Sequence, residues 1–326
     1  MRTGGTMVCW GYNDRGQLGN GTDNTTPNYV PTAVKLASGL LLEGVVGLPP
    51  TQGSQHSCAL VVGGQARCWG YDSPGSLGDG DASLDDQVNP VVVGPVGTPL
   101  SDIRALALGG NHSCAVLNSG QARCWGQNNF AQVGDGGGAN RTVPEKVLQS
   151  AGVPLTAVQA MALGDFHSCV LMTNNTVRCW GRNDHGQLGD GTVDLPGKEG
   201  SHLYPTAVLV APGGAPLGGV QALAVGSSHG CAIVAGGEVR CWGSNTYGQL
   251  GDPEVPATPG GVLDKPSAVL VKLASGQPLT GVLGLALGEH HMRCWGLNEY
   301  GQLGRDENLG TNKANPAPLP VQGLVP

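Results

Sequence analysis

The sequence is poor in charged and aromatic residues and contains no long apolar run. Charged residues make up 13% of its 326 residues and aromatic residues 4%, and the net charge is −7. Lys and Arg stand singly rather than in a basic stripe, so we expect no binding to nucleic acid or to anionic lipid. No stretch approaches the roughly 20 apolar residues that cross a bilayer, and the residues after Met1 lack the apolar core of a secretory signal. We therefore expect no membrane insertion.

Glycine and hydrophobic residues are plentiful instead. The 56 Gly and 23 Pro could indicate a low-complexity chain, but 40% of the residues are hydrophobic and recur in phase, which favours a packed core. Six Trp-Gly dipeptides hold every Trp of the chain and stand between 53 (295−242) and 62 (242−180) residues apart. These dipeptides begin at Trp10, Trp69, Trp125, Trp180, Trp242 and Trp295. Self-similarity of this period predicts an array of small β units, and we expect one domain over residues 1–326.

Each unit repeats one order of segments. In the unit around Trp125, an apolar segment at 105–109 precedes a His-Ser-Cys segment at 112–116, a turn at Gly120 and a Cys-Trp-Gly segment at 122–126. Short apolar runs separated by glycine turns every eight to twelve residues predict antiparallel strands. A Pro-x-x-Val segment supplies a fourth strand. The sequence therefore predicts an all-β fold, a β-propeller of four-stranded antiparallel blades with six repeat units.

Eight of the ten cysteines form four pairs whose members stand ten positions apart. In a hairpin centred on Gly63 or its equivalent, the two members face each other at a Cα separation of about 4.5–5.5 Å. This separation lies inside the range of about 4.4–6.8 Å that a disulfide accepts. The predicted bridges are Cys58–Cys68, Cys114–Cys124, Cys169–Cys179 and Cys231–Cys241. Four bridges would indicate an oxidising, extracytoplasmic compartment.

Two other interpretations of the paired cysteines stay open. They could be small buried thiols of a reduced, cytoplasmic protein. Alternatively, His112 and Cys114 share a strand face with Cys124 across from them, and three N/S ligands plus water would resemble an open zinc site. The four-fold recurrence and the lack of a nearby acid disfavour this site, so we expect no metal and no cofactor.

A histidine recurs at one position of the repeat. It stands at His56, His112, His167, His229 and His290. In the first four units a Ser or Cys follows within two residues, which superficially suggests a base and a nucleophile. A residue repeated in every unit usually has the same structural role in each, and no unit adds the orienting acid and oxyanion donors of acyl transfer. We predict no catalytic residue and no enzymatic activity.

The first and last units differ from the other four. The chain starts at the position of a hairpin turn, so the unit at Trp10 lacks its His-Ser-Cys strand and Cys9 lacks a partner. Near the other end the interval from His290 to Trp295 is 5 (295−290) where four units have 13, which leaves Cys294 unpaired. We expect four complete blades, a split one and a shortened one. Both a fragment of a seven-bladed parent and a true six-unit ring stay open.

The segment from Trp180 to Thr192 resembles the regulator of chromosome condensation repeat. It reads Trp-Gly-Arg-Asn-Asp-His-Gly-Gln-Leu-Gly-Asp-Gly-Thr and follows a His-Ser-Cys segment at 167–169 and Arg178-Cys179. Similar strings begin at Trp10, Trp242 and Trp295, so the resemblance covers nearly the whole chain and implies the propeller fold. The paired cysteines look more like the bacterial, exported branch of this family.

The resemblance implies several functions. The founding member exchanges nucleotide on a small nuclear GTPase and binds chromatin, and other members inhibit β-lactamases, sense ultraviolet light through Trp clusters or hold partners. A shared fold does not select among these. The basic tail of the exchange factor is absent here, and the Trp residues stand one per blade rather than in clusters.

One position varies while its surroundings stay constant. It lies three residues before the Leu or Val of the Gly-Gln-Leu-Gly turn and holds Arg15, Pro74, Phe130, His185, Tyr247 and Tyr300. These residues would suit a partner-binding rim, or the aromatic ones could only cover the glycines of the turn. The sequence therefore favours a non-enzymatic scaffold that binds a protein of unknown identity. The alternatives are a guanine-nucleotide exchange factor for a small GTPase and an inhibitor of a partner enzyme.

Overall fold

The computed structural model describes most of the chain. The described residues are 1–2, 4–49, 53–81, 85–95, 98–195, 202–252, 264–273 and 275–285, together with the strand residues 296–297 and 314–315. Strands are the only regular elements within these residues. The chain divides into two units, Met1–Ser168 and Cys169–Pro326, and the division falls inside one strand.

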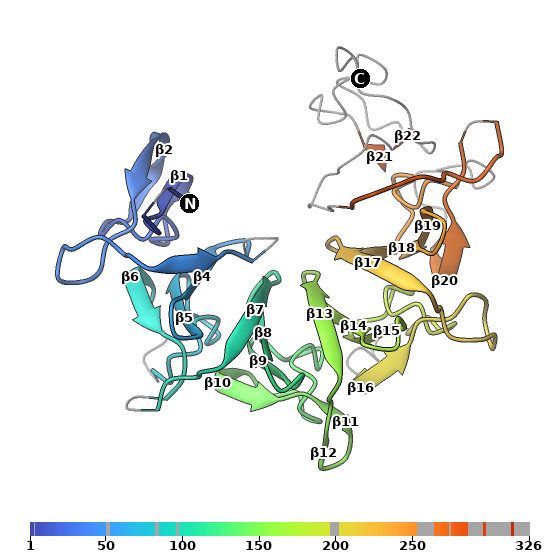
Figure 1. Cartoon of the computed structure of the whole chain (residues 1–326), viewed down its shortest axis with the longest axis horizontal. Coiled ribbons are helices and arrows are strands. Elements are labelled where there is room, and N and C mark those ends of the chain that lie inside the picture. Colours follow the sequence, from blue (N-terminus) through green and yellow to red (C-terminus); the bar gives the residue numbers. More distant parts are fainter. Residues whose placement is uncertain are drawn as a thin grey trace. The chain divides into compact units, whose positions relative to one another are not determined.

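Four antiparallel sheets contain four strands each, and neighbouring strands in a sheet are consecutive in the sequence (Figure 1). The first is β3 (Val45–Gly47), β4 (His56–Val61), β5 (Gln65–Gly70) and β6 (Gln87–Val92), and the second is β7 (Ile103–Leu108), β8 (His112–Leu117), β9 (Ala122–Gly126) and β10 (Arg141–Lys146). The third is β13 (Val158–Leu163), β14 (His167–Met172), β15 (Val177–Gly181) and β16 (His202–Ala207), and the fourth is β17 (Val220–Val225), β18 (His229–Val234), β19 (Glu238–Gly243) and β20 (Lys265–Leu270). The predicted four-stranded antiparallel blades are confirmed.

The predicted hairpins bring the paired cysteines together. In the β4–β5 hairpin Cys58 lies directly opposite Cys68, as Cys231 lies opposite Cys241 between β18 and β19. All four predicted disulfides are present, each with a Cα separation of 4.1 Å, slightly shorter than the expected range. Because Cys114 and Cys124 are bridged to each other, they cannot act as thiolate ligands, so the zinc interpretation is wrong.

The fourth strand of each sheet contains a proline, as the Pro-x-x-Val pattern predicts. The four prolines are Pro90, Pro144, Pro205 and Pro266. Proline cannot donate a ladder hydrogen bond and is therefore confined to edge strands and bulges. Each fourth strand lies at the edge of its sheet and shows a register irregularity against its neighbour.

The hydrophobic clusters of the first unit lie between successive sheets. In the first unit Trp125 of β9 packs with Cys58 and Cys68 of the preceding sheet, and Trp69 of β5 packs with residues around Met7. The side chains of Trp69, Trp125, Trp180 and Trp242 are fully buried. The closing glycine of the Gly-Gln-Leu-Gly motif lies beneath the next Trp: a Cβ at Gly78, which has a φ of +70°, would overlap the Trp125 ring.

The sheet nearest the start of the chain is smaller. It consists of β1 (Val8–Asn13) and β2 (Asn24–Ala33), with Cys9 half-buried and unpaired and with Trp10 62% exposed. Two further two-stranded sheets pair β11 (Leu148–Ser150) with β12 (Val153–Pro154) and β21 (Gly296–Leu297) with β22 (Ala314–Asn315). The residues predicted to mark the last unit, His290, Cys294, Trp295 and Tyr300, lie outside the described residues.

Candidate functional site: the variable turns

Five turns of the described chain have the same construction. They span residues 13–19, 72–78, 128–134, 183–189 and 245–251, and we call them the variable turns. Each begins with a buried Asn or Asp whose Oδ1 accepts the N–H of the residue five positions later, at 2.9–3.1 Å. A buried side chain therefore closes each turn from inside.

A second bond fixes the backbone of the variable residue itself. In four turns a glutamine accepts the backbone N–H of the residue two positions before it, at 2.8 or 2.9 Å. The turn at 72–78 is the exception, because its variable residue, Pro74, has no N–H and Ser76 replaces the glutamine. Because these bonds use only the backbone of the variable residue, its side chain is not needed to form the turn.

The variable side chain of the first turn makes charged contacts. Arg15 lies 3.3 Å from Asp86 and stacks over the ring of Tyr71 at 5.2 Å, with 45% of its side chain exposed. The other carboxylate oxygen of Asp86 accepts the backbone N–H of Asp72 at 3.2 Å. Asp86 thus links Arg15 to the start of the next variable turn.

The second unit repeats this link with other residues. His185 Nδ1 lies 2.7 Å from Asp264 Oδ2, and Asp264 Oδ1 accepts the backbone N–H of Asn245 at 3.0 Å. The hydrogen bond to Asp264 raises the pKa of His185 above its ordinary value, against the effect of burial. In both units a basic variable residue therefore pairs with the acid that caps the following turn.

The remaining variable residues have apolar surroundings or face solvent. Phe130 meets Phe166 edge to face, with ring centroids 5.2 Å apart. Pro74 is half-buried and Tyr247 is 43% exposed. The structure thus places five of the six predicted residues on equivalent turns, and three of those five also contact other parts of their own unit. Their role as a partner-binding rim stays a prediction.

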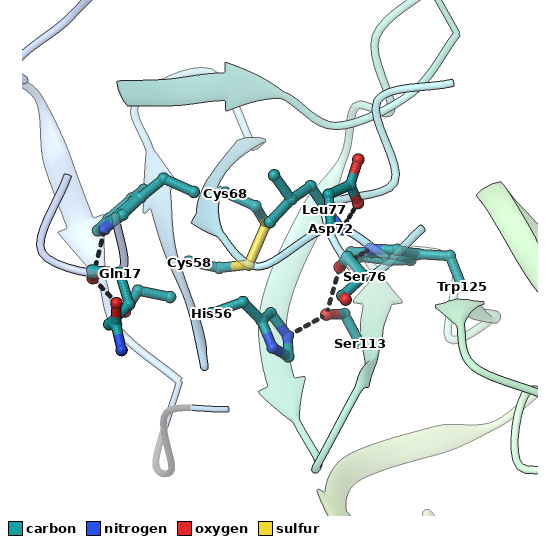
Figure 2. The surroundings of a disulfide bond; sticks show 11 residues. Gln17, His56, Cys58, Cys68, Asp72, Ser76, Leu77, Ser113 and Trp125 are labelled. Atoms are coloured by element: carbon teal, nitrogen blue, oxygen red, sulfur yellow. Dashed lines mark hydrogen bonds between the residues drawn. A yellow bond between two sulfur atoms is a disulfide. The ribbon is translucent and has the colours of Figure 1, made fainter. Parts of the chain in front are cut away.

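Two of the recurring histidines, His56 and His112, form part of the interface between sheets. Figure 2 shows His56 of β4 pointing toward Ser113 of β8, and the distance from His56 Nε2 to Ser113 Oγ is 2.8 Å. Ser113 Oγ donates to the carbonyl oxygen of Ser76 at 3.0 Å, and Trp125 Nε1 donates to that same oxygen at 2.9 Å. The prediction that a repeated histidine serves a structural role agrees with this geometry.

The hydrogen-bond directions in this network differ from those between a serine nucleophile and its histidine base. Burial lowers the pKa of His56 to about 4 and that of His112 to about 3, so both rings are neutral near pH 7. Because the Ser113 hydroxyl donates to the Ser76 carbonyl, its oxygen accepts a hydrogen bond from the N–H at His56 Nε2. A histidine that activates a serine would instead have to accept the serine's proton.

The same arrangement recurs at neighbouring turns. His112 Nε2 lies 2.9 Å from Ser168 Oγ, which donates to the carbonyl of Gln132 at 2.8 Å. Gln17 accepts from both Ser57 and Trp69, and Gln187 accepts from Trp242. In four of the five turns the carbonyl of the residue before the Leu or Val therefore connects that turn to the next sheet. The repeat pattern alone did not reveal this acceptor, because it is a backbone atom.

Within the described ranges, no group of three or more His, Cys, Asp and Glu side chains is arranged to bind a metal ion. The described residues also form no helix that is long and apolar enough to cross a bilayer.

Comparison with known proteins gives one family. The RCC1-like domain model matches residues 1–325. The ultraviolet-B receptor UVR8 of Arabidopsis thaliana is 27% identical over 317 residues, which cover 95% of this chain and 65% of the receptor. The human E3 ubiquitin-protein ligase HERC2 is 30% identical over 264 residues, 78% of this chain but 5% of the ligase. The chain thus spans less than two thirds of the length of these relatives.

Solved structures show the same fold. The crystal structure of Kap60 bound to yeast RCC1 (Prp20) contains a chain that matches with a TM-score of 0.72 and 21% identity, over 97% of this chain and 72% of that one. The structure of Prp20p from Saccharomyces cerevisiae, described with its binding to Gsp1p and histones, matches with a TM-score of 0.70 and 19% identity over 99% of this chain and 76% of that one. These likenesses show the β-propeller fold alone.

Proposed function

Because the chain belongs to the RCC1-like domain family, we propose that it is a non-enzymatic scaffold whose variable turns contact a protein partner. The observation that supports this function is that different residues of each turn hold the backbone and face outward. Buried amides and glutamines hold the backbone, so one outward position can change without loss of the turn. Protein complexes of the solved relatives, such as yeast RCC1 (Prp20) with Kap60, support a binding role.

Cross-linking at matched positions tests this proposal. A photoreactive amino acid at Tyr247, which is 43% exposed, should cross-link a partner, whereas the same group at Val210, which is 40% exposed outside the variable turns, should not. With the identified partner purified, Tyr247→Ala should weaken binding by about tenfold, the loss typical of an interface anchor. Val210→Ala should leave the affinity unchanged. Equal cross-linking at the two positions, or an unchanged affinity in Tyr247→Ala, would contradict the proposal.

A guanine-nucleotide exchange factor is the second candidate. The likeness to Prp20p, whose structure was described with binding to Gsp1p, favours this candidate. It predicts that the purified protein accelerates nucleotide release from a member of a small GTPase panel. Nucleotide release at the intrinsic rate across that panel would contradict the exchange-factor candidate. Inhibition of a partner enzyme would then remain as a narrower form of the binding function.

The compartment we propose is extracytoplasmic. Its support is the set of four cross-strand disulfides, because such bonds persist in oxidising environments. Mass spectrometry of protein alkylated in the host cells, without reduction, should find the eight paired cysteines unmodified. Alkylation of all eight would place the protein in a reducing compartment.

A further inference from the structure

One variable turn begins with an acid where the other four begin with an amide. In the amide turns Oδ1 closes the turn, and in three of the four Nδ2 donates to the residues that follow, whereas Asn245 Nδ2 has no partner among the described residues. Asn13 Nδ2 donates to the Thr22 carbonyl at 2.9 Å, Asn183 Nδ2 to the Thr192 carbonyl at 3.1 Å, and Asn128 Nδ2 to Asp135 Oδ1 at 3.1 Å. These turns therefore place acceptors around the second atom of the first side chain.

Asp72 occupies this position in the turn at 72–78. Its Oδ1 accepts the N–H of Leu77 at 2.9 Å, as the amide oxygens do in the other turns (Figure 2). The side chain has no exposed surface, and its Oδ2 is buried without a hydrogen-bond partner among the described residues. An ionised carboxylate has no proton to donate, so Oδ2 cannot replace an amide N–H unless it is protonated.

The charged groups around Asp72 favour the protonated form. Asp79, at the position of Asp135, and Asp81, at the position of Thr22, both act on its carboxyl group, as does Asp86. Two cations lie nearby, and both have other partners. Arg15 pairs with Asp86, and Arg141, whose backbone packs against Gly75 of the turn, pairs with Asp135.

We propose that Asp72 is a pH-sensitive latch, whose protonated carboxyl group stands in for the amide of the other turns and holds the turn at 72–78 closed. Loss of the proton places a buried negative charge among three further carboxylates, and the turn loosens. Burial raises the pKa of Asp72 from 3.8 to about 7 against the lowering effect of the Leu77 hydrogen bond, and the charges of Asp79, Asp81 and Asp86 raise it further. The latch thus changes state in the range where many compartments differ in pH.

The direction of the pH effect follows from this shift. The folded state holds the proton more tightly than the unfolded chain, so stability is lost as the pH rises from about 4 to about 7 and changes little above that. The latch acts on the turn that presents Pro74. It does not depend on whether Pro74 binds a partner, so failure of the scaffold proposal would leave it standing.

Two variants and one direct measurement test the latch. In wild-type protein, the ¹³C resonance of the Asp72 carboxyl group should titrate near pH 7. The urea unfolding constant should rise between pH 5 and pH 8 by up to about a hundredfold more than in Asp72→Asn, in which the turn has the amide of its neighbours. Asn128→Asp, the reverse exchange in a matched turn beside Asp135, should acquire a similar pH dependence.

Three outcomes would overturn the latch. The Asp72 carboxyl group could titrate near pH 4, which needs no variant to detect. Wild type and Asp72→Asn could show parallel pH profiles. Calcium chloride at pH 8 could stabilise wild type but not Asp72→Asn beyond the effect of equal ionic strength, which would make a cation rather than a proton the occupant.

Discussion

The Cys-Trp-Gly triplet occurs in two very different settings. In β9, Trp125 is fully buried, donates to the Ser76 carbonyl and follows a cysteine held in a disulfide. In β1 the same triplet has an unpaired Cys9 and a Trp10 that is 62% exposed. The contrast shows that the triplet does not bury its own Trp. A paired hairpin strand and the turn of the preceding sheet do so.

The largest expected effect comes from truncating the indole in each setting. Trp125→Ala should lower the free energy of unfolding by about 3–5 kcal/mol, because a large buried ring leaves a cavity. Trp10→Ala should change it by less than about 0.5 kcal/mol, as surface substitutions do. Urea unfolding measures both, and Trp125→Phe, which keeps much of the apolar volume, should fall between them. Equal losses in the two alanine variants would remove the distinction.

Acid should destabilise the four-stranded sheets selectively. Within the described residues, the buried histidine–serine hydrogen bonds belong to these sheets. Burial lowers the pKa of His56 from 6.5 to about 4, so the folded state resists protonation and stability falls as the pH drops from 6.5 toward 4. The loss should be about 3 kcal/mol at its limit. In His56→Gln, which can still donate to Ser113, unfolding curves at pH 6.5 and pH 4 should differ by correspondingly less. Identical acid sensitivity in both proteins would refute this.

Removing one disulfide should have a somewhat smaller effect. The double variant Cys114→Ala, Cys124→Ala should lose about 2–3 kcal/mol of stability, mainly because the unfolded chain gains freedom. Cys9→Ala in β1 serves as the control and should change stability by less than about 1 kcal/mol, because no bridge is lost. Thermal unfolding of both variants without reductant checks this order. A comparable loss in Cys9→Ala would point to a covalent role for that thiol.

The smallest effect separates two equivalent serines. Ser113→Ala removes a hydroxyl that joins His56 to the Ser76 carbonyl and leaves a buried histidine donor without its acceptor, at a cost of about 2 kcal/mol. Ser57 follows the two-stranded sheet and makes one bond, to the Gln17 carbonyl. Ser57→Ala should therefore cost about 1 kcal/mol. Denaturant titrations at pH 7 would contradict the network if Ser57→Ala proved the more harmful.

The sequence predicted the features that depend on contacts within one repeat. A separation of ten positions between Cys114 and Cys124 is enough to define a hairpin, its register and its disulfide, because neighbouring strands joined by a short turn have few ways to pair. The Pro-x-x-Val pattern likewise predicted the fourth strand of each sheet from residues within one repeat. The RCC1-like family and the propeller fold were likewise evident from the repeated string.

Contacts between successive repeats could not be predicted from the sequence. The acceptor for Trp125 is the backbone oxygen of Ser76, 49 residues away, and no side-chain pattern marks it. The link from Arg15 to Asp86 joins two turns whose proximity only the fold creates. Asp72 was detectable in principle, because alignment of the turns shows one acid among four amides. Its importance became clear only with its complete burial.

The acceptor at the Ser76 position has a consequence for how this chain can diverge. A carbonyl oxygen exists whatever residue occupies position 76, so point substitution cannot delete it. Glutamine fills the equivalent position at Gln17, Gln132 and Gln187, whose carbonyl oxygens accept hydrogen bonds from Trp69, Ser168 and Trp242, respectively. The hydrogen bond that joins one blade to the next at this carbonyl therefore does not depend on which residue occupies the site. Descendants of this sequence can acquire new outward chemistry two residues away while the architecture persists.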